Sequence, residues 1–145
     1  FNRLKESFNE TFKELFKGGS ADLIITGGDE LSGNIDITVQ PPGKRLQNIN
    51  LMSGGEKGLS AIALLFAILK IKPTPFCILD EIEAALDDAN VARYASFLKK
   101  FSNEIQFIVI THRRGTMEAS DVLYGVTMEE KGVSKIVSVS LKDEY

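Results

Sequence analysis

Three features that define large classes of protein are missing from this sequence. Only one cysteine, Cys77, occurs among 145 residues, which excludes an intramolecular disulfide and favours a packed core thiol in a cytosolic protein. No apolar run is long enough to span a bilayer and no signal peptide is found, so we expect no membrane partner. Positive charge is not in excess: 17 basic and 20 acidic residues give a net charge of −3, so any DNA contact must be local or come from other segments.

What the sequence does contain is enough apolar material for one hydrophobic core. Its residues are 43% hydrophobic and 26% charged, and neither internal repeats nor a long linker divide it, so we expect a single soluble domain. The first residue is Phe1 rather than Met, which leads us to expect that the chain is a piece of a longer protein.

Apolar periodicity predicts alternating helices and strands. In chain order we expect an amphipathic helix over 1–16 that stops at Gly18-Gly19, strands over 21–26 and 35–40, a helix over 59–69, a strand over 76–79, a helix from Asp87 or Asp88 to Phe101, a strand over 106–110, and a hairpin of 122–128 and 133–141. The apolar stripe of the first helix is too wide for a coiled-coil seam, so this helix is expected to pack on the domain.

The stretch Phe76-Cys77-Ile78-Leu79-Asp80-Glu81 runs from four apolar residues into two carboxylates. The apolar part predicts a strand buried on both faces, as in a parallel α/β sheet. Asp80 and Glu81 are then expected at its C-terminal edge, where ligands bind in open α/β sheets. There one acid can hold Mg²⁺ and its neighbour can polarise an attacking water, which is the form of a Walker B motif. The alternative is a strand that simply ends in two surface acids.

A second strand is expected to bring the only histidine to the same edge. The strand over 106–110 follows a helix of suitable length for a right-handed crossover, and it ends at Thr111-His112. We therefore expect His112 beside Asp80 and Glu81, with a structural and a catalytic role both open.

Ser53-Gly54-Gly55-Glu56 stands at the start of the apolar helix. Ser53 and Glu56 have the spacing of a capping box. Capping does not explain the two glycines, each of which lowers helix propensity by roughly 1 kcal/mol relative to alanine. They favour a site where another surface, most naturally a phosphate, approaches bare N–H groups at a positive helix end.

In this order and spacing, the motifs resemble the C-terminal half of the ABC-type ATPase head of the SMC (structural maintenance of chromosomes) family, over nearly all of the chain. Ser53-Gly54-Gly55-Glu56 matches the signature motif, 76–81 Walker B, 85–90 the D-loop and 110–112 the switch-histidine loop. The stretches 40–44, 75–81 and 111–118 resemble the bacterial branch in particular. Met52 stands where the family usually has leucine or a similar apolar residue, a small change for an adaptable apolar side chain.

The resemblance implies an α/β fold: the C-terminal lobe of an ABC-type (P-loop NTPase-like) head, with a mostly parallel sheet, flanking helices and a C-terminal β-hairpin. Residues 1–19 would form a helix leading in from a coiled coil, and 20–145 would carry the motifs. No G-x-x-x-x-G-K-[ST] phosphate loop occurs, so the Walker A lobe is expected elsewhere in the protein. This chain alone is then expected neither to bind ATP tightly nor to hydrolyse it.

The resemblance also implies ATP and Mg²⁺ as ligands and assigns roles to individual residues. Asp80 would orient Mg²⁺ through water, Glu81 would be the base toward the attacking water, and His112 would contact the γ-phosphate. The signature residues would meet ATP bound on an opposite head; they are Ser53, Gly54, Gly55 and Glu56. Asp87 of the D-loop would communicate between the two sites.

The implied partners are the N-terminal lobe, a second head in a homodimer, a kleisin subunit, and the DNA that the family entraps in chromosome condensation and segregation. The protein would be cytoplasmic and nucleoid-associated. Two alternatives stay open: the head lobe of a related coiled-coil ABC ATPase of DNA double-strand-break repair, and a docking module without catalysis.

Overall fold

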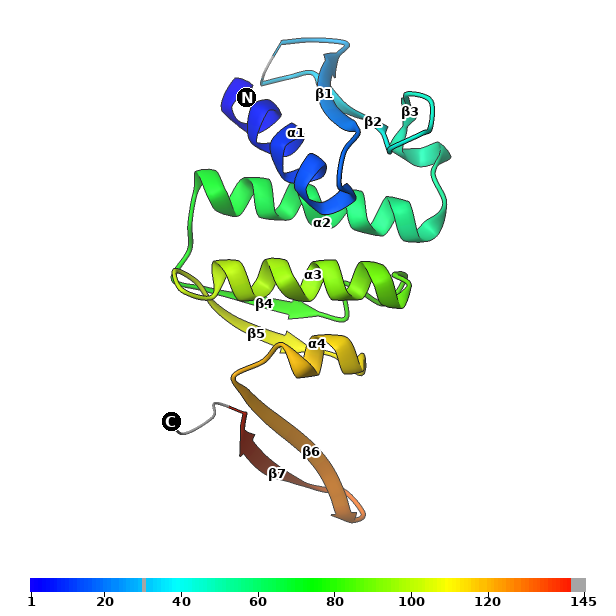
Figure 1. The fold of residues 1–145 in the computed structure, drawn as a ribbon. Helices are drawn as coiled ribbons and strands as arrows, with labels where there is room; N and C mark the ends of the chain where they lie inside the picture. The colour runs from blue at the N-terminus through cyan, green and yellow to red at the C-terminus, as the bar shows by residue number, and fades with distance from the viewer. Residues whose placement is uncertain (30, 142–145) are drawn as a thin grey trace.

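The computed structural model describes residues 1–29 and 31–141, so Glu30 and 142–145 of the expected 1–145 lobe lie outside the described residues. Its elements in chain order are α1 (Asn2–Phe16), β1 (Ser20–Thr26), β2 (Asn34–Gln40), β3 (Gln47–Asn48), the 3₁₀ turn η1 (Ile49–Leu51), α2 (Gly54–Ile71), β4 (Phe76–Asp80), α3 (Asp88–Phe101), β5 (Gln106–Ile110), α4 (Arg114–Glu118), β6 (Val122–Glu130) and β7 (Val133–Ser140). Figure 1 shows them in layers, with α1 and β1–β3 at one end, α2 and α3 in the middle, and the β6–β7 hairpin at the other end.

The first helix packs on the domain as predicted. α1 buries Phe8, Phe12 and Leu15, and the Ser7 hydroxyl donates to the Ala67 carbonyl of α2 at 3.1 Å. The chain then reverses through Gly19, whose φ is 78°. A Cβ at Gly19 would lie 2.2 Å from a backbone carbonyl oxygen, so this position requires glycine.

The strands form three separate sheets within the described residues. β1, β2 and β3 are antiparallel, β4 and β5 are parallel, and β6 and β7 form an antiparallel hairpin. The expected mostly parallel sheet is therefore confined to β4 and β5. The strands of the antiparallel pairs have short connections, such as 27–33 between β1 and β2 and 131–132 between β6 and β7, whereas a parallel crossover needs a dozen residues or more.

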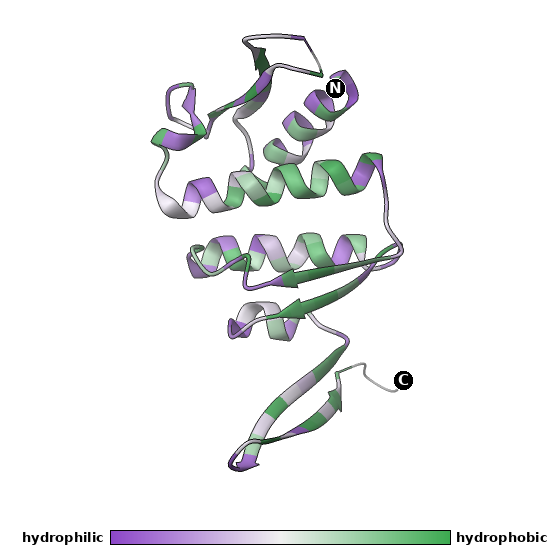
Figure 2. Cartoon of the chain, turned by 180° about the vertical axis from the view of Figure 1, so that it is seen from behind, coloured by the Kyte–Doolittle hydropathy of each residue, from purple (hydrophilic) through white to green (hydrophobic). Residues whose placement is uncertain are grey.

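The central strand is buried on one face, and the prediction of two buried faces is wrong for the described chain. Leu79 is 4% exposed and lies in the core with α2 and α3, whereas Phe76 and Ile78 are 54% and 59% exposed. On the covered side, Phe66 of α2 packs on Phe107 of β5 with ring centroids 6.3 Å apart. No element in the described ranges covers the other side, and Figure 2 shows how apolar β4 and β5 are.

None of the described helices combines the length and the apolar character that crossing a membrane requires.

Candidate functional site

The C-terminal edge of the β4–β5 pair brings together Asp80, Glu81 and His112. Asp80 ends β4 and is paired in register with Ile110, the last residue of β5. The Glu81 N–H donates to the Ile110 carbonyl at 2.9 Å, and Nδ1 of His112 lies 3.2 Å from Oε1 of Glu81. The predicted proximity of the three residues is confirmed, while their roles stay predictions.

Glu81 leaves the strand in an unusual backbone conformation. Its φ of 47° lies in the left-handed region, where residues other than glycine are uncommon. The turn directs its carboxylate outward, and both this side chain and that of His112 remain more than half exposed. A carboxylate and an imidazole in contact at an open edge can exchange a proton with a molecule bound there. Strained backbone of this kind is a feature of functional sites.

The edge fits a cation that is held jointly with a ligand. Within 1–29 and 31–141, no group of three or more Asp, Glu, His or Cys side chains lies close enough to hold a metal ion. Mg²⁺ does not need such a group, because it keeps several waters and binds through one or two carboxylates together with substrate phosphates. Asp80 and Glu81 are carboxylates of that kind, next to each other at the strand end.

The predicted capping box is present at the start of α2. Ser53 is the N-cap, its Oγ accepts from the Glu56 N–H in a long bond of 3.5 Å, and it donates to Oε2 of Glu56 at 3.0 Å. Glu56 also pairs with the Lys44 ammonium. Lys44 holds the pKa of this carboxyl below its ordinary value, partial burial opposes the shift, and Ser53 adds to it.

The two glycines of the signature motif differ in their surroundings. A Cβ added to Gly55 would lie 3.2 Å from the Ala85 carbonyl oxygen, so close packing against the D-loop segment explains this glycine. A Cβ added to Gly54 would meet nothing within 4 Å, and its φ is not positive. Neither packing nor backbone conformation among the described residues requires a glycine at 54, and the predicted approach of an external surface stays a prediction.

Both D-loop aspartates have structural partners. Asp87 is the N-cap of α3 and accepts from the Asn90 N–H at 2.8 Å, as one of the two was predicted to do. Asp88 pairs with Arg113, whose Nη2 lies 2.8 Å away. The communicating role of Asp87 is not tested by this geometry.

The signature residues and the sheet edge form two distinct groups. In the described part of the chain, no hydrogen bond or ion pair joins Ser53, Gly54, Gly55 or Glu56 to Asp80, Glu81 or His112.

Sequence patterns did not point to two residues that hold this region together. Glu83 is 1% exposed and accepts from Thr111 and Thr116. Arg113 donates to the Leu86 carbonyl at 2.9 Å in addition to its bond with Asp88. The sequence alone does not distinguish a buried glutamate from an exposed one, so the burial of Glu83 could not be predicted from it.

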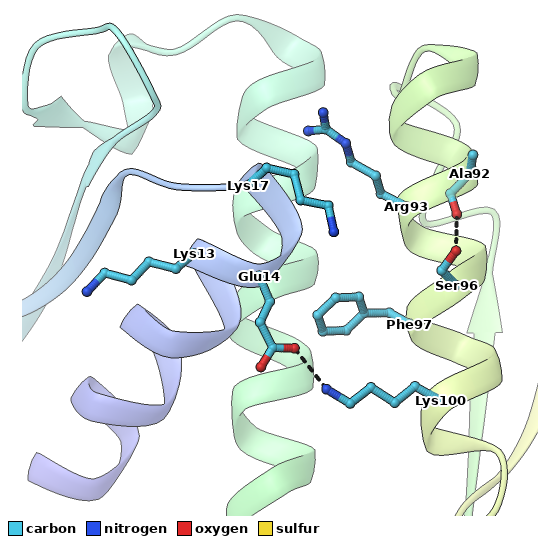
Figure 3. Close-up of a pocket in the computed structure, with 8 residues that line it drawn as sticks. All are labelled: Lys13, Glu14, Lys17, Ala92, Arg93, Ser96, Phe97 and Lys100. Carbon is cyan, nitrogen blue, oxygen red and sulfur yellow. Dashed lines mark hydrogen bonds and ion pairs between the residues drawn. The ribbon is translucent and has the colours of Figure 1, made fainter.

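A hollow of about 510 Å³ between α1 and α3 is rich in cations but lies apart from the edge. Figure 3 shows Glu14 and Lys100 meeting across it, at 2.9 Å. Arg93 donates to the Leu15 carbonyl at 3.3 Å, in the last turn of α1. Positive side chains here compensate the negative end of the helix dipole, which accounts for this cluster structurally.

Comparison with known proteins gives consistent matches along the chain. Residues 10–135 match the family model "RecF/RecN/SMC N terminal domain". The chain is 83% identical over 141 residues to the chromosome partition protein Smc of Clostridium kluyveri (strain NBRC 12016), covering 97% of this chain but only 12% of that protein.

Two solved structures are similar to the described fold. One is the "Crystal structure of the SmcHead bound to the C-winged helix domain of ScpA", with a TM-score of 0.89 and 50% identity, covering 98% of this chain and 44% of that one. The other comes from "Structural biochemistry of ATP-driven dimerization and DNA stimulated activation of SMC ATPases", with a TM-score of 0.88 and 48% identity, covering 97% and 85%.

Proposed function

The chain belongs to the RecF/RecN/SMC N-terminal domain family, as one lobe of an SMC-type ATPase head, and from this premise we propose that it supplies the hydrolytic groups of an ATPase that acts in chromosome segregation. One observation carries the proposal most: Glu81 and His112 meet at 3.2 Å beside Asp80, at the edge of the sheet where ligands bind.

Each edge residue has a role that suits its position. The Glu81 carboxylate accepts the proton of the water that attacks the γ-phosphate, because it is exposed and turned out of the strand. His112 donates to a γ-phosphate oxygen and, through its contact with Glu81, keeps that carboxylate oriented. Asp80 would help to hold Mg²⁺, which would offset the negative charge of the phosphates.

The start of α2 provides a second contact with nucleotide. Ser53 and Gly54 are exposed at a helix N-terminus, where backbone N–H groups and the helix dipole favour an anion. Within the described residues no hydrogen bond or ion pair joins them to the Glu81 edge, and we propose that the phosphate they meet is one carried by another head. ATP would thus lie between two heads, in keeping with the "ATP-driven dimerization" of SMC ATPases to which one solved relative belongs.

An N-terminal lobe would complete the sheet. A cavity of about 990 Å³ lies between β5, α4 and β6, and among its lining residues are Ile108, Ile110 and Val126. One edge of β5 has no partner strand in the described residues. This apolar slot beside an unpaired strand suits an added strand, and the missing phosphate loop must come from such a segment.

The remaining partners follow from the relatives. A solved head with 50% identity is bound to the C-winged-helix domain of ScpA, so a subunit of that type would dock on this lobe. The high identity to a chromosome partition protein favours DNA entrapment in chromosome segregation over DNA repair, and the assembled edge favours catalysis over a docking module.

Substitution of Glu81 in the complete head tests the proposal. Glu81→Gln keeps the shape and removes the base, so ATP should bind and heads should remain dimeric while turnover falls at least a hundredfold. Glu104→Gln, an exposed glutamate in the turn before β5, is the matched control and should behave as wild type. Normal turnover by Glu81→Gln would contradict the assignment.

A further inference from the structure

A buried carboxylate holds the loop that carries His112. Oε1 of Glu83 accepts from the Thr111 hydroxyl and from the Thr116 hydroxyl, the second at 3.0 Å. The Thr111 oxygen in turn accepts from the Arg113 N–H at 3.0 Å. The residues on both sides of His112 are therefore tied, directly or through one hydroxyl, to the same carboxylate.

The carboxylate occupies a costly position. Glu83 is 1% exposed, and its Oε2 has no hydrogen-bond partner among the described residues. Tyr94 lies close by, and its pKa is raised by burial and by the Glu83 carboxylate. Burial of an ionisable group that is not fully paired is unfavourable, and an apolar side chain of similar size often stabilises a fold as well or better. Stability of the core alone does not explain a glutamate here.

Arg113 ties the same loop to the D-loop. Its guanidinium donates to the Leu86 carbonyl at 2.9 Å and to Asp88 at 2.8 Å, at the start of α3. Glu83 itself belongs to the turns that link Glu81 to the D-loop. Three side-chain contacts thus join the segment 81–88 to the segment 111–113. They are Glu81 with His112, Glu83 with Thr111, and Asp88 with Arg113.

We infer that Glu83 is a positioning residue for hydrolysis: it binds Thr111 and thereby fixes His112 against Glu81. The inference rests on the proposed function and extends it, since it concerns a buried residue that lies beneath the exposed edge groups. The anchored loop presents His112 in one orientation. A second head would contact the D-loop, and a displacement of the D-loop would move His112 through the bonds of Glu83 and Arg113.

The test compares two threonines that donate to the same oxygen. In a head reconstituted with its N-terminal lobe, Thr111→Val removes the anchor next to His112, and Thr116→Val removes the equivalent bond from α4. We expect Thr111→Val to lower kcat at least tenfold with ATP affinity within twofold, and Thr116→Val to stay within threefold of wild type. Thr111→Ser keeps the hydroxyl and should restore the rate.

Two substitutions of Glu83 decide the matter if Thr111→Val does not fold. The amide oxygen of Glu83→Gln can still accept from Thr111, so kcat should stay within about threefold, whereas Glu83→Leu should lose at least tenfold. His112 is the only histidine of the chain, so it gives a single imidazole NMR signal when this chain, and not the N-terminal lobe, is isotopically labelled. We expect this signal to shift in Thr111→Val and Glu83→Leu, and to stay unchanged in Thr116→Val and Glu83→Gln.

Equal losses in Thr111→Val and Thr116→Val, or full activity in Glu83→Leu, would overturn the inference and leave Glu83 a structural residue. Failure of the proposed function gives a different result: the wild-type head then shows no ATP turnover, or Glu81→Gln retains it.

Discussion

At the scale of single residues, the structure separates glycines that the fold needs from one that it does not. Gly19 has no room for a side chain and Gly55 has little, since a carbonyl oxygen lies 2.2 Å and 3.2 Å, respectively, from an added Cβ. Gly54 has open space around it at the N-terminus of α2. A glycine that lowers helix propensity, with no reason for it among the described residues, agrees with the proposed contact outside the chain.

Substitution of Gly54 by alanine should have different effects on the stability of this chain and on the ATP-dependent dimerisation of the head. Gly54→Ala should leave the free energy of unfolding of this chain unchanged or raise it by up to about 1 kcal/mol, because helix propensity improves. The added methyl group should hinder the approach of an opposing head and weaken ATP-dependent dimerisation at least tenfold. Urea unfolding of the chain and size exclusion of the reconstituted head with ATP measure the two effects.

Gly58→Ala is the control for this substitution. Its Cβ would lie in ordinary contact with Leu86, at 3.6 Å, so it should gain similar helix propensity without changing the dimer. If Gly54→Ala forms dimers as well as Gly58→Ala does, the external contact at Gly54 is wrong.

At the scale of elements, the start of α2 depends on an ionised glutamate. Lys44 is the main cause of the lowered pKa of Glu56, against partial burial and with help from Ser53. Because the folded-state pKa lies below the ordinary value of 4.5, ionised Glu56 stabilises the fold above that pH. The contribution is lost as the pH falls through the folded-state pKa.

Removal of the lysine should therefore have a pH-dependent effect. Lys44→Met should lower the free energy of unfolding by less than about 1 kcal/mol at neutral pH, since the pair is partly exposed. The difference from wild type should shrink as the pH is taken below 4.5. Lys131→Met, in the β6–β7 turn and without an ion pair in the described residues, should show no such dependence. A Lys44→Met effect that is constant with pH would contradict the linkage to Glu56.

Elements that depend on local pattern were predictable from the sequence. The alternation of Ile35, Ile37 and Val39 marked β2, and the spacing of Ser53 and Glu56 marked a helix start that the structure confirms. The common edge of Asp80 and His112 followed from the rule that parallel strands end together.

Features that depend on long-range packing were not predictable in this way. Ile78 and Ile108 are apolar but half exposed. An apolar sequence pattern indicates that a strand face is suited to burial, but it does not indicate whether the covering segment belongs to the same chain. Glu83 is polar but buried, because hydroxyls from a segment about thirty residues away along the chain compensate its carboxylate.

At the scale of the whole molecule, two apolar surfaces are exposed in the part of the chain that the structure describes. Phe76, Ile78, Ile108 and Ile110 lie on one face of the β4–β5 pair, in adjacent register positions. The hairpin exposes apolar side chains along both strands, among them Tyr124, Val126 and Ile136. Exposed apolar patches of this extent mark interaction surfaces. The sequence contains no phosphate loop, and under the proposed function the segment that covers the sheet would also bring one.

The chain alone should therefore differ from the chain with its N-terminal lobe in both surface and activity. We expect the isolated chain to bind the dye ANS on its exposed apolar faces and to show no ATP turnover. Mixing with the N-terminal lobe should reduce ANS fluorescence, raise the melting temperature, and restore turnover that depends on Glu81. A mixture that contains the Glu81→Gln chain should reproduce the first two changes without the third, which separates assembly from catalysis. Steady ATP turnover by the pure isolated chain would contradict this division of labour, because it would require a phosphate-binding loop that the sequence does not contain.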